Sequence, residues 1–295
     1  MTKSAFISIC GRPNVGKSTL LNALIGEKIA IVSKKPQTTR TRITGVVTRG
    51  ESQYVFIDTP GIHRPRTKLG EYMMKSVGSS IGDTDITLFV VEAGRELTEG
   101  ERDALRRAFS DNGNVILVIN KCDAVNKTLV AETIRDLSAQ YDFTAVVPIS
   151  ALTGDGVSLI FDELEPLLVD SPHFFPDDQL TDMPEKQLVA EMIREKVLRL
   201  TDDEIPHGVA VVIEEFKERR GAIAIRAELF CERETHKRIL IGKNGSMLKK
   251  IGTYAREDAE AFFGAKVYLD LWVKVKENWR DRQSLLNSFG YGEDR

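Results

Sequence analysis

The first half of the chain alternates short apolar runs with stretches in which apolar residues recur every three or four positions. The runs are rich in β-branched residues and predict strands, whereas stretches such as 18–26 and 98–109 have the spacing of helices. Strands without a polar face that alternate with helices are typical of a mainly parallel sheet with helices on both faces. We therefore predict an α/β domain over residues 1–170. Its strands are expected at 5–10, 54–58, 86–93, 114–120 and 145–150.

Prolines at 172, 176 and 184 separate this region from a second one with a different pattern. Because proline removes a backbone donor and disfavours helix in the preceding residue, 171–184 is predicted to be a linker. The remaining residues, 185–295, predict a smaller α+β domain with a short C-terminal tail. Its elements are expected in the order helix 185–200, strands 208–216 and 221–232, helices 234–241 and 246–263, and strand 265–276. Strand alternation places Ile223, Ile225, Ala227 and Leu229 on one face, and Val267, Leu269, Leu271, Val273 and Val275 on another.

The two regions also differ in charge. Residues 1–184 hold 20 Lys and Arg against 24 Asp and Glu, whereas residues 185–295 hold 21 against 20. Within the second region, 233–256 has seven basic residues and a single acid, Glu234. Such a run is most often a solvated face, but this one surrounds a glycine loop and therefore favours an anionic partner. The seven are Arg233, Lys237, Arg238, Lys243, Lys249, Lys250 and Arg256.

Composition limits the class of protein further. No apolar run approaches the roughly 20 residues that a membrane-spanning helix needs, and the first residues lack the apolar core of a signal peptide. Cys10, Cys122 and Cys231 share no metal-ligand spacing and form an odd set, so we expect reduced thiols. These features favour a cytosolic protein of two domains.

The first glycine loop, GRPNVGKS at 11–18, follows a predicted strand and opens a predicted helix. This context fits the Walker A pattern, in which backbone N–H groups and the N-terminus of the helix surround a β-phosphate. Lys17 is expected to bridge the β- and γ-phosphates, and the Ser18 hydroxyl to hold Mg²⁺. The pattern alone leaves ATP and GTP open. The nucleotide-binding residues predicted in this loop are Gly11, Asn14, Val15, Gly16, Lys17, Ser18 and Thr19.

Three further motifs end predicted strands, in the order that a GTPase requires. Asp58 begins DTPG, where its carboxylate is expected to serve Mg²⁺ and the N–H of Gly61 to sense the γ-phosphate. Asp123 of NKCD can accept from both the N1–H and the amine of guanine, and adenine lacks this donor pair. The N–H of Ala151 is expected to meet guanine O6. The remaining predicted nucleotide-binding residues are Asn120, Lys121 and Ser150.

The polar stretch 35–45 lies where GTPases order a loop around the γ-phosphate. It should bring a threonine hydroxyl to Mg²⁺, for which Thr39 is the first choice and Thr38 the alternative. After DTPG, many GTPases have a glutamine that orients water, but this chain has Ile62, which neither donates nor accepts. His63 is expected to be an exposed loop residue and not a base. We therefore predict slow intrinsic hydrolysis, on the order of 10⁻⁴ to 10⁻² s⁻¹. The predicted catalytic residues are Lys17, Thr39 and Gly61.

The second glycine loop, GKNG at 242–245, lies between two predicted helices and at the centre of the basic run. Two glycines allow a sugar and phosphate to approach the main chain without a Cβ clash, and the next helix adds the positive end of its dipole. A lone GxxG is more often a turn between helices, but this setting favours a clamp on an RNA backbone. The loop has no catalytic set and is therefore predicted to be a binding site. The predicted RNA-binding residues are Ile241, Gly242, Lys243, Asn244, Gly245, Lys249 and Lys250, with Ile239 and Ile241 forming an apolar floor.

The motifs GRPNVGKS, QTTRT, DTPGIH, NKCD and SAL, in this order, resemble those of bacterial P-loop GTPases of the TrmE–Era–EngA group. The linker and the closing ILIGKNGSMLKKIG and VYLDLWVKVKENWR narrow the resemblance to the Era family over essentially the whole chain. The resemblance implies a GTPase domain followed by a type II KH domain, which fits the predicted order of elements. It also implies binding of the 3′ end of small-subunit ribosomal RNA, a role in maturation of the small ribosomal subunit, and control of RNA engagement by nucleotide state.

Further implications concern cofactors and location. Asn14 matches the position that helps to ligate K⁺ beside the phosphates in potassium-dependent members of the group, so K⁺ joins Mg²⁺ as an expected cofactor. Family relatives attach peripherally to the inner membrane, and the same contact is implied here for a cytoplasmic protein. We expect a monomer.

Two other classes of GTPase were weighed. One is a signalling switch at the membrane surface whose C-terminal domain binds protein rather than RNA. Aspartate in place of Gly242 or Gly245 should abolish RNA binding and leave GTP hydrolysis intact, which distinguishes the two classes. The tRNA-modifying GTPases of the same group are disfavoured, because 295 residues leave no room for the folate-binding and helical domains expected in them.

Overall fold

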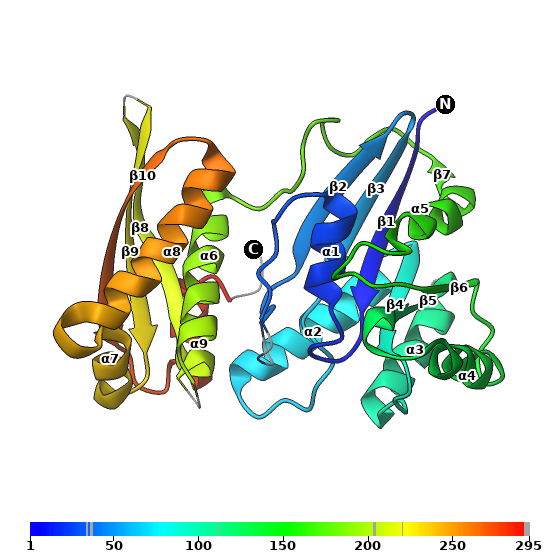
Figure 1. Cartoon of the computed structure of the whole chain (residues 1–295), viewed down its shortest axis with the longest axis horizontal. Helices are drawn as coiled ribbons and strands as arrows, with labels where there is room; N and C mark the ends of the chain where they lie inside the picture. The colour runs from blue at the N-terminus through cyan, green and yellow to red at the C-terminus, as the bar shows by residue number, and fades with distance from the viewer. Residues whose placement is uncertain (34, 36–37, 112, 203–204, 220, 292–295) are drawn as a thin grey trace. The chain divides into compact units, whose positions relative to one another are not determined.

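The computed structural model describes residues 1–295 except 34, 36–37, 112, 203–204, 220 and 292–295 (Figure 1). Residues 36–37 of the predicted switch stretch and residue 220 of the predicted hairpin turn therefore lie outside the described residues. The chain divides into two compact units, which we describe separately. The first unit comprises Met1–Ala30, Thr39–Pro65 and Met73–Asp182, and the second comprises Ile31–Thr38, Arg66–Tyr72 and Met183–Arg295.

The sheet of the first unit has the strand order β2-β3-β1-β4-β5-β6. Its inner strands are parallel and mostly buried, as their apolar runs predict, whereas β2 pairs antiparallel with β3 and β7 antiparallel with β1. The mainly parallel sheet is thus confirmed. The strands are β1 (Lys3–Cys10), β2 (Ile43–Arg49), β3 (Ser52–Asp58), β4 (Ile86–Glu92), β5 (Val115–Asn120), β6 (Ala145–Pro148) and β7 (Val169–Asp170).

Helices alternate with these strands along the chain (Figure 1). Because β1, β3, β4, β5 and β6 run parallel, their carboxyl ends meet at one edge of the sheet, where the sequence motifs follow. The cysteines at 10, 122 and 231 carry free thiols. The helices are α1 (Lys17–Ile25), α2 (Lys68–Gly82), α3 (Glu99–Asp111), α4 (Lys127–Ser138) and α5 (Val157–Leu164).

The end of the first unit is an ordered strap and not a free tether. The buried side chain of Gln53 accepts the N–H groups of Phe174 (2.8 Å) and Phe175 (3.0 Å) through its oxygen. Further along, the N–H of Val46 donates to the carbonyl of Leu180 at 2.8 Å. Residues through Asp182, which include most of the predicted linker, therefore lie along β2 and β3.

The second unit contains a sheet of order β10-β9-β8, with α6 and α8 packed against the same face (Figure 1). Strand β8 is antiparallel to β9, and β10 is parallel to it. The predicted order helix–strand–strand–helix–helix–strand is confirmed. The elements are α6 (Glu185–Leu200), β8 (Ala210–Arg219), β9 (Ala222–Cys231), α7 (Glu234–Ile241), α8 (Ser246–Phe263) and β10 (Lys266–Val275).

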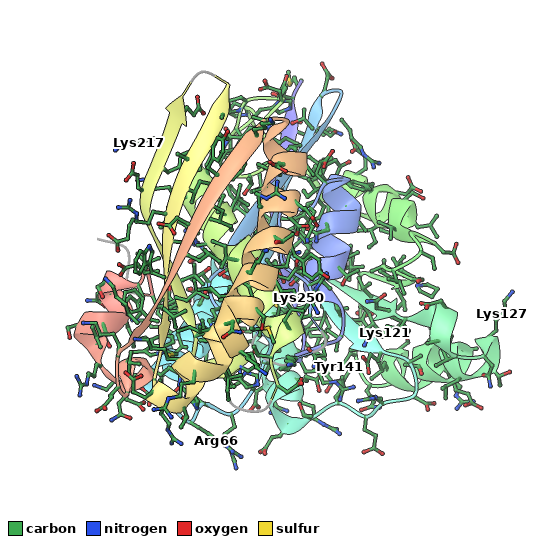
Figure 2. The ribbon with its side chains drawn as sticks, turned by 60° about the vertical axis from the view of Figure 1, so that its left-hand side comes forward. Arg66, Lys121, Lys127, Tyr141, Lys217 and Lys250 are labelled. Atoms are coloured by element: carbon green, nitrogen blue, oxygen red, sulfur yellow. The ribbon has the colours of Figure 1, made fainter. Side chains whose placement is uncertain are left out.

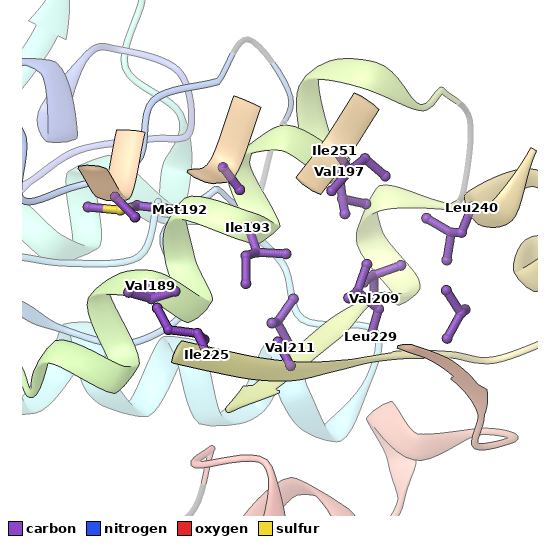
Figure 3. Packing of buried hydrophobic residues seen from close by; sticks show 14 of the residues in the cluster. Val189, Met192, Ile193, Val197, Val209, Val211, Ile225, Leu229, Leu240 and Ile251 are labelled. Atoms are coloured by element: carbon purple, nitrogen blue, oxygen red, sulfur yellow. The ribbon is translucent and has the colours of Figure 1, made fainter. Parts of the chain in front are cut away.

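The core of the second unit lies between this sheet and its helices (Figure 3). The predicted inner face of β9 is buried throughout, and the alternating face of β10 is buried or partly buried. Apolar residues along most of the length of α6 contribute to this core. The residues that meet there include Val189, Met192, Ile193 and Val197 from α6, Val211 from β8, Ile225 and Leu229 from β9, Leu240 from α7 and Ile251 from α8.

The predicted C-terminal tail contains structure of its own. A short 3₁₀ turn (Trp279–Asp281) precedes α9 (Gln283–Ser288). Trp279 is fully buried and its indole N–H donates to the carbonyl of Gly208 at 2.9 Å. Phe289 stacks on Phe230 of β9 with ring centroids 4.6 Å apart. The tail thus covers one end of the outer face of the sheet. No helix in the described part of the chain is long and apolar enough to cross a bilayer.

Candidate functional site

The first glycine loop has a backbone that only glycine tolerates at two positions. Gly11 and Gly16 have φ of 147° and 100°, in the region that favours glycine. A Cβ at Gly16 would lie 2.3 Å from Nδ2 of Asn120, and one at Gly11 would lie 2.3 Å from the carbonyl oxygen of Val90. The loop is thus pressed against the ends of β4 and β5, and side chains are absent where the backbone must pass closely.

Lys17 begins α1 and is buried, with 6% of its surface exposed. Its Nζ donates to the carbonyls of Gly11 and Arg12, both at 3.0 Å, so the ammonium is folded over the loop. Burial lowers the pKa of Lys17 and the nearby Asp58 carboxylate opposes that shift. A lysine held here places one positive charge inside the loop, as phosphate binding requires.

Three hard oxygen groups converge beside Lys17. The hydroxyl of Ser18 donates to Oδ2 of Asp58 at 2.6 Å, and the hydroxyl of Thr39 donates to the same oxygen at 3.2 Å. The two hydroxyl oxygens are 2.8 Å apart. Burial raises the pKa of Asp58, against the charge of Lys17. Thr38 instead donates to the carbonyl of Lys35 at 2.7 Å, which supports the choice of Thr39.

This cluster fits a magnesium ion on its own chemistry. Oδ1 of Asp58 is buried and has no hydrogen-bond partner among the described residues. A buried carboxylate oxygen without a donor is costly unless a cation or water meets it. Oxygen ligands from one carboxylate and two hydroxyls suit Mg²⁺, which takes one or two carboxylates together with the phosphates of its nucleotide.

Asn120 connects the phosphate loop to the base-binding loops. Its Nδ2 donates to the carbonyl of Val15 at 2.7 Å, and its Oδ1 accepts the N–H of Lys121 (2.8 Å) and of Ala151 (2.9 Å). Ala151 was expected to direct its N–H at guanine O6, and here that N–H already has an acceptor. Asp123 is exposed at the same edge, and the buried Ser150 hydroxyl accepts the N–H of residue 153 at 3.2 Å.

Sequence reasoning missed the carboxylate that organises the cations of this site. Glu92, at the end of β4, pairs with Lys121 and Arg95, and lies 3.8 Å from Arg12 of the phosphate loop. Lys121, which is labelled in Figure 2, also donates to the carbonyl of Asn14 at 2.6 Å. Because Glu92 is a strand-end residue outside every motif, only its position beside NKCD in the sheet reveals it.

The DTPG loop closes over the phosphate loop. A Cβ at Gly61 would lie 2.6 Å from the backbone nitrogen of Pro13, and the N–H of Ile62 donates to the carbonyl of Gly11 at 3.0 Å. The prediction that His63 is exposed is wrong. Its ring is partly buried, Nδ1 lies 2.7 Å from the carbonyl oxygen of Gly61, and Nε2 is buried without a partner among the described residues.

In the second unit, three of the four residues of the GKNG loop have a positive φ. Gly242, Asn244 and Gly245 have φ of 74°, 53° and 77°. A Cβ on Gly242 would lie 2.8 Å from the backbone nitrogen of Met247, whereas Gly245 faces open space. Because α8 starts at Ser246, its first N–H groups follow the loop directly. A turn with exposed Lys243 and Asn244 thus leads directly into a helix N-terminus, an arrangement whose backbone N–H groups can bind an anion.

Exposed cations surround this loop. Lys243, Lys249 and Lys250 are exposed, and within the described residues no ion pair engages them. Lys250 lies on α8 (Figure 2), with Nζ 5.9 Å from the ring centroid of Tyr254 one turn further along. Tyr254 is 42% exposed and Ile239 is 48% exposed. The aromatic ring was not singled out from the sequence, although its i+4 spacing from Lys250 could have indicated it.

Comparison with protein-family models matches both units. A model described as a 50S ribosome-binding GTPase matches residues 6–121, and a KH domain model matches residues 204–280. The first match spans the phosphate loop, DTPG and the start of NKCD. The second spans the GKNG loop.

Whole-chain relatives give the same pair of domains. GTPase Era of Clostridium kluyveri is 49% identical over 292 residues, covering 99% of this chain and all of the relative. GTPase Era of Clostridioides difficile is 48% identical, with 99% and 100% covered. A crystal structure of Era in complex with MgGDPNP and nucleotides 1506–1542 of 16S ribosomal RNA superposes with a TM-score of 0.95 at 38% identity, over 99% of this chain and 100% of that one. An Era variant of Aquifex aeolicus bound to GDP and AlF₄⁻ gives 0.92 at 37%, with the same coverage.

Proposed function

Because this chain belongs to the Era family of GTPases, we propose that it binds the 3′ end of small-subunit ribosomal RNA and assists maturation of the small ribosomal subunit, under control of its bound nucleotide. The observation that carries the proposal is the GKNG loop, with its positive-φ backbone and with lysines that have no ion-pair partner among the described residues. It lies on a chain of which 99% superposes on Era from a complex with 16S ribosomal RNA. The description of the matching GTPase model refers to the large (50S) ribosomal subunit, but the match is confined to residues 6–121 and does not include the GKNG loop.

The first unit supplies GTP hydrolysis. Lys17 binds the β- and γ-phosphates, and Ser18, Thr39 and Asp58 hold Mg²⁺, which neutralises charge on the phosphates when bound. The N–H of Gly61 meets the γ-phosphate. Since Ile62 cannot orient a water molecule, intrinsic hydrolysis is slow, on the order of 10⁻⁴ to 10⁻² s⁻¹. Single-turnover hydrolysis of GTP measures this rate directly.

Guanine recognition rests on Asp123, whose exposed carboxylate accepts both donors of the base edge. Lys121 covers the base while Glu92 and the Asn14 carbonyl hold its ammonium in place. The O6 contact of Ala151 requires its N–H to be shared with Asn120.

A potassium ion beside the phosphates is the remaining cofactor of this proposal. Asn14 has a left-handed backbone (φ 66°) in the phosphate loop and is exposed, so its side chain is accessible to a cation. A cation there would take the place of an arginine finger. Hydrolysis rates in KCl and NaCl at equal ionic strength should differ, and the Asn14→Ala variant should remove the difference.

RNA binding is tested with a labelled RNA that copies the 3′ end of small-subunit ribosomal RNA, against a scrambled RNA at fixed salt. Gly245→Asp places a carboxylate at the open side of the loop, and should abolish binding while GTP hydrolysis stays at the wild-type rate. Equal binding of both RNAs by the wild-type protein would contradict the proposal.

The alternative of a membrane-surface switch whose C-terminal domain binds protein has no support in the comparisons, and the KH match favours RNA. A cytoplasmic location follows from the proposed ribosomal partner. We propose a monomer. Flotation with anionic vesicles tests a peripheral inner-membrane contact, and sedimentation equilibrium tests the monomer.

A further inference from the structure

Two segments from the first half of the sequence belong to the second unit, namely Ile31–Thr38 and Arg66–Tyr72. Each adjoins the nucleotide site along the chain, because Thr38 precedes Thr39 and the second segment follows the DTPG loop. These are the places where GTPases change backbone conformation with nucleotide state. The second unit therefore includes two segments that adjoin the nucleotide-sensitive loops along the chain.

Helix α6 holds the first of these segments by its main chain. The N–H of Val32 donates to Oε1 of Glu195 at 3.0 Å, and the carbonyl of Val32 accepts from Arg199 at 3.2 and 3.3 Å. At the other end, the carbonyl of Thr38 accepts from Nη2 of Arg194, a guanidinium that is 1% exposed. The described ends of the segment are thus fixed to one face of α6.

From Glu195 a chain of ion pairs leads across the second unit. Glu195 is fully buried, and its other oxygen, Oε2, accepts from Nζ of Lys196 at 2.9 Å. Lys196, 5% exposed, also donates to Oδ2 of Asp258 on α8. Helices α6 and α8 lie side by side along this contact (Figure 1).

Helix α8 connects this series of ion pairs to the proposed RNA-binding loop. It begins at Ser246, the residue after GKNG, and Asp258 lies twelve residues later, about 18 Å along the axis. A helix packed on a sheet moves as a rigid element, so a displacement at Asp258 reaches the loop at its N-terminus. Buried charges strengthen the link, because separating one partner leaves the other uncompensated in a region of low dielectric.

We infer that Glu195, Lys196 and Asp258 form an ion-pair relay that transmits the position of Val32 to α8 and its RNA-binding loop. The inference rests on the proposed nucleotide control of RNA binding and names the residues that carry it. All three are positioning residues, since they touch neither nucleotide nor RNA. When Thr39 engages the nucleotide site, the adjoining segment shifts against Glu195, and Lys196 carries that shift to Asp258.

Linkage makes the relay measurable in both directions. If nucleotide state changes RNA affinity by a given factor, RNA changes the preference for the GTP analogue over GDP by the same factor. Couplings of this kind are commonly about 5- to 150-fold. A cut relay should reduce both factors toward one, and leave GTP affinity in the absence of RNA unchanged.

The test uses the full chain with two variants that cut the relay at different points. Lys196→Met removes the central charge while keeping an unbranched apolar side chain, and Glu195 retains Arg199 as a partner at 2.9 Å. Asp258→Asn removes the charge on α8, where 26% of the side chain is exposed, and so should fold readily. The matched control is Glu257→Gln, the exposed neighbouring acid on the same helix.

Anisotropy of the labelled 3′-end RNA is measured with GDP and with a non-hydrolysable GTP analogue. We expect the wild type and Glu257→Gln to share one ratio of RNA affinities, and Lys196→Met and Asp258→Asn to bring that ratio close to one. A double variant should then show no further loss. Variants that keep the wild-type ratio, or that weaken RNA binding equally in both states, overturn the relay. A ratio of one in the wild type overturns nucleotide control itself, and with it the premise of the relay.

Discussion

The two glycine loops of this protein have a similar local arrangement, but they differ in how far other parts of the chain enclose them. Both loops precede a helix and have backbone N–H groups suited to phosphate, which the nucleotide and the proposed RNA ligand both carry. The loop at 11–18 is enclosed, with Lys17 buried and Asn120 bonded to Val15 beneath it. The loop at 242–245 is exposed, and the lysines around it have no ion-pair partner among the described residues.

This difference matches the ligands. A nucleotide is small and is bound by residues at the ends of several strands. Its loop therefore depends on residues that are distant in sequence. An RNA strand is long and is held by many shallow contacts, so its loop needs only local geometry and charge. Substitutions distant in sequence should therefore strongly lower nucleotide affinity at the first loop. RNA affinity at the second loop should depend mainly on residues in and next to that loop.

The largest effect is expected from Asn120→Ala. It removes the amide that bonds Val15, Lys121 and Ala151, and leaves buried main-chain groups without partners. Each such group costs about 1–3 kcal/mol, so GTP affinity should fall by about 100-fold or more. Competition against labelled GDP measures the loss. RNA binding without nucleotide serves as the control and should be unchanged. If the variant bound GTP with wild-type affinity, the first loop would not depend on Asn120 for its conformation.

Sequence patterns predicted the parts of both sites that depend on local order. Helix α7 was expected at 234–241 and α8 at 246–263, and the structure shows both bounds. Strand-end motifs came together because parallel strands share an edge. The pattern could not show that Asn120 takes the N–H of Ala151, or that Trp279 bonds Gly208, since such pairs link distant residues. His63 was misjudged for the same reason, because its burial depends on packing from other segments.

Substitution of the two glycines of the second loop should lower RNA affinity to different extents, because their backbone conformations differ. Alanine at Gly242 meets both a forbidden backbone (φ 74°, ψ 175°) and the nitrogen of Met247, whereas Gly245 has an ordinary left-handed conformation and free space. Strain of this kind costs about 1–3 kcal/mol. RNA affinity should therefore fall by about tenfold or more for Gly242→Ala and less for Gly245→Ala.

Gly264→Ala provides the matched control for this pair. Gly264 has φ of 62° at the opposite end of α8, with no atom near its absent Cβ. It carries the same left-handed strain without touching the loop. Anisotropy titrations of the three variants, together with urea unfolding, separate loop geometry from helix stability. Equal losses of RNA affinity in all three would mean that the loop contributes nothing specific.

The exposed lysines should act through salt-dependent contacts. Lys249→Ala and Lys250→Ala are each expected to weaken RNA binding about three- to tenfold, and to lower the slope of log affinity against log salt by about 0.7, the value for one phosphate on a single strand. GTP affinity should not change. Lys217→Ala is the control, because Lys217 lies on β8 (Figure 2) and forms an ion pair with Glu215 at 2.8 Å. If Lys217→Ala lowered the slope of log affinity against log salt as much, the lysines near the second loop would contact RNA no more than lysines elsewhere on the unit.

The smallest expected effect is a pH dependence confined to the first unit. His173, in the strap after β7, lies 2.6 Å from the carboxylate of Asp177 and 3.1 Å from the carbonyl of Glu51. Both acceptors can be satisfied only by the imidazolium. The hydrogen bond to Asp177, and then that to Glu51, therefore raise the pKa of His173 above its ordinary value of about 6.5.

A raised histidine pKa stabilises the folded state at low pH. The contribution is fully present below about pH 6.5 and is lost as pH rises through the higher pKa of the folded protein. Because Asp177 is exposed, the effect should stay under about 1 kcal/mol. Urea unfolding at pH 6 and pH 9 should show a larger cost of His173→Gln at pH 6. RNA affinity of the two proteins should respond identically to pH, since the strap supports β3 and not the GKNG loop. A cost that grows from pH 6 to pH 9 would mean that the imidazolium destabilises the strap.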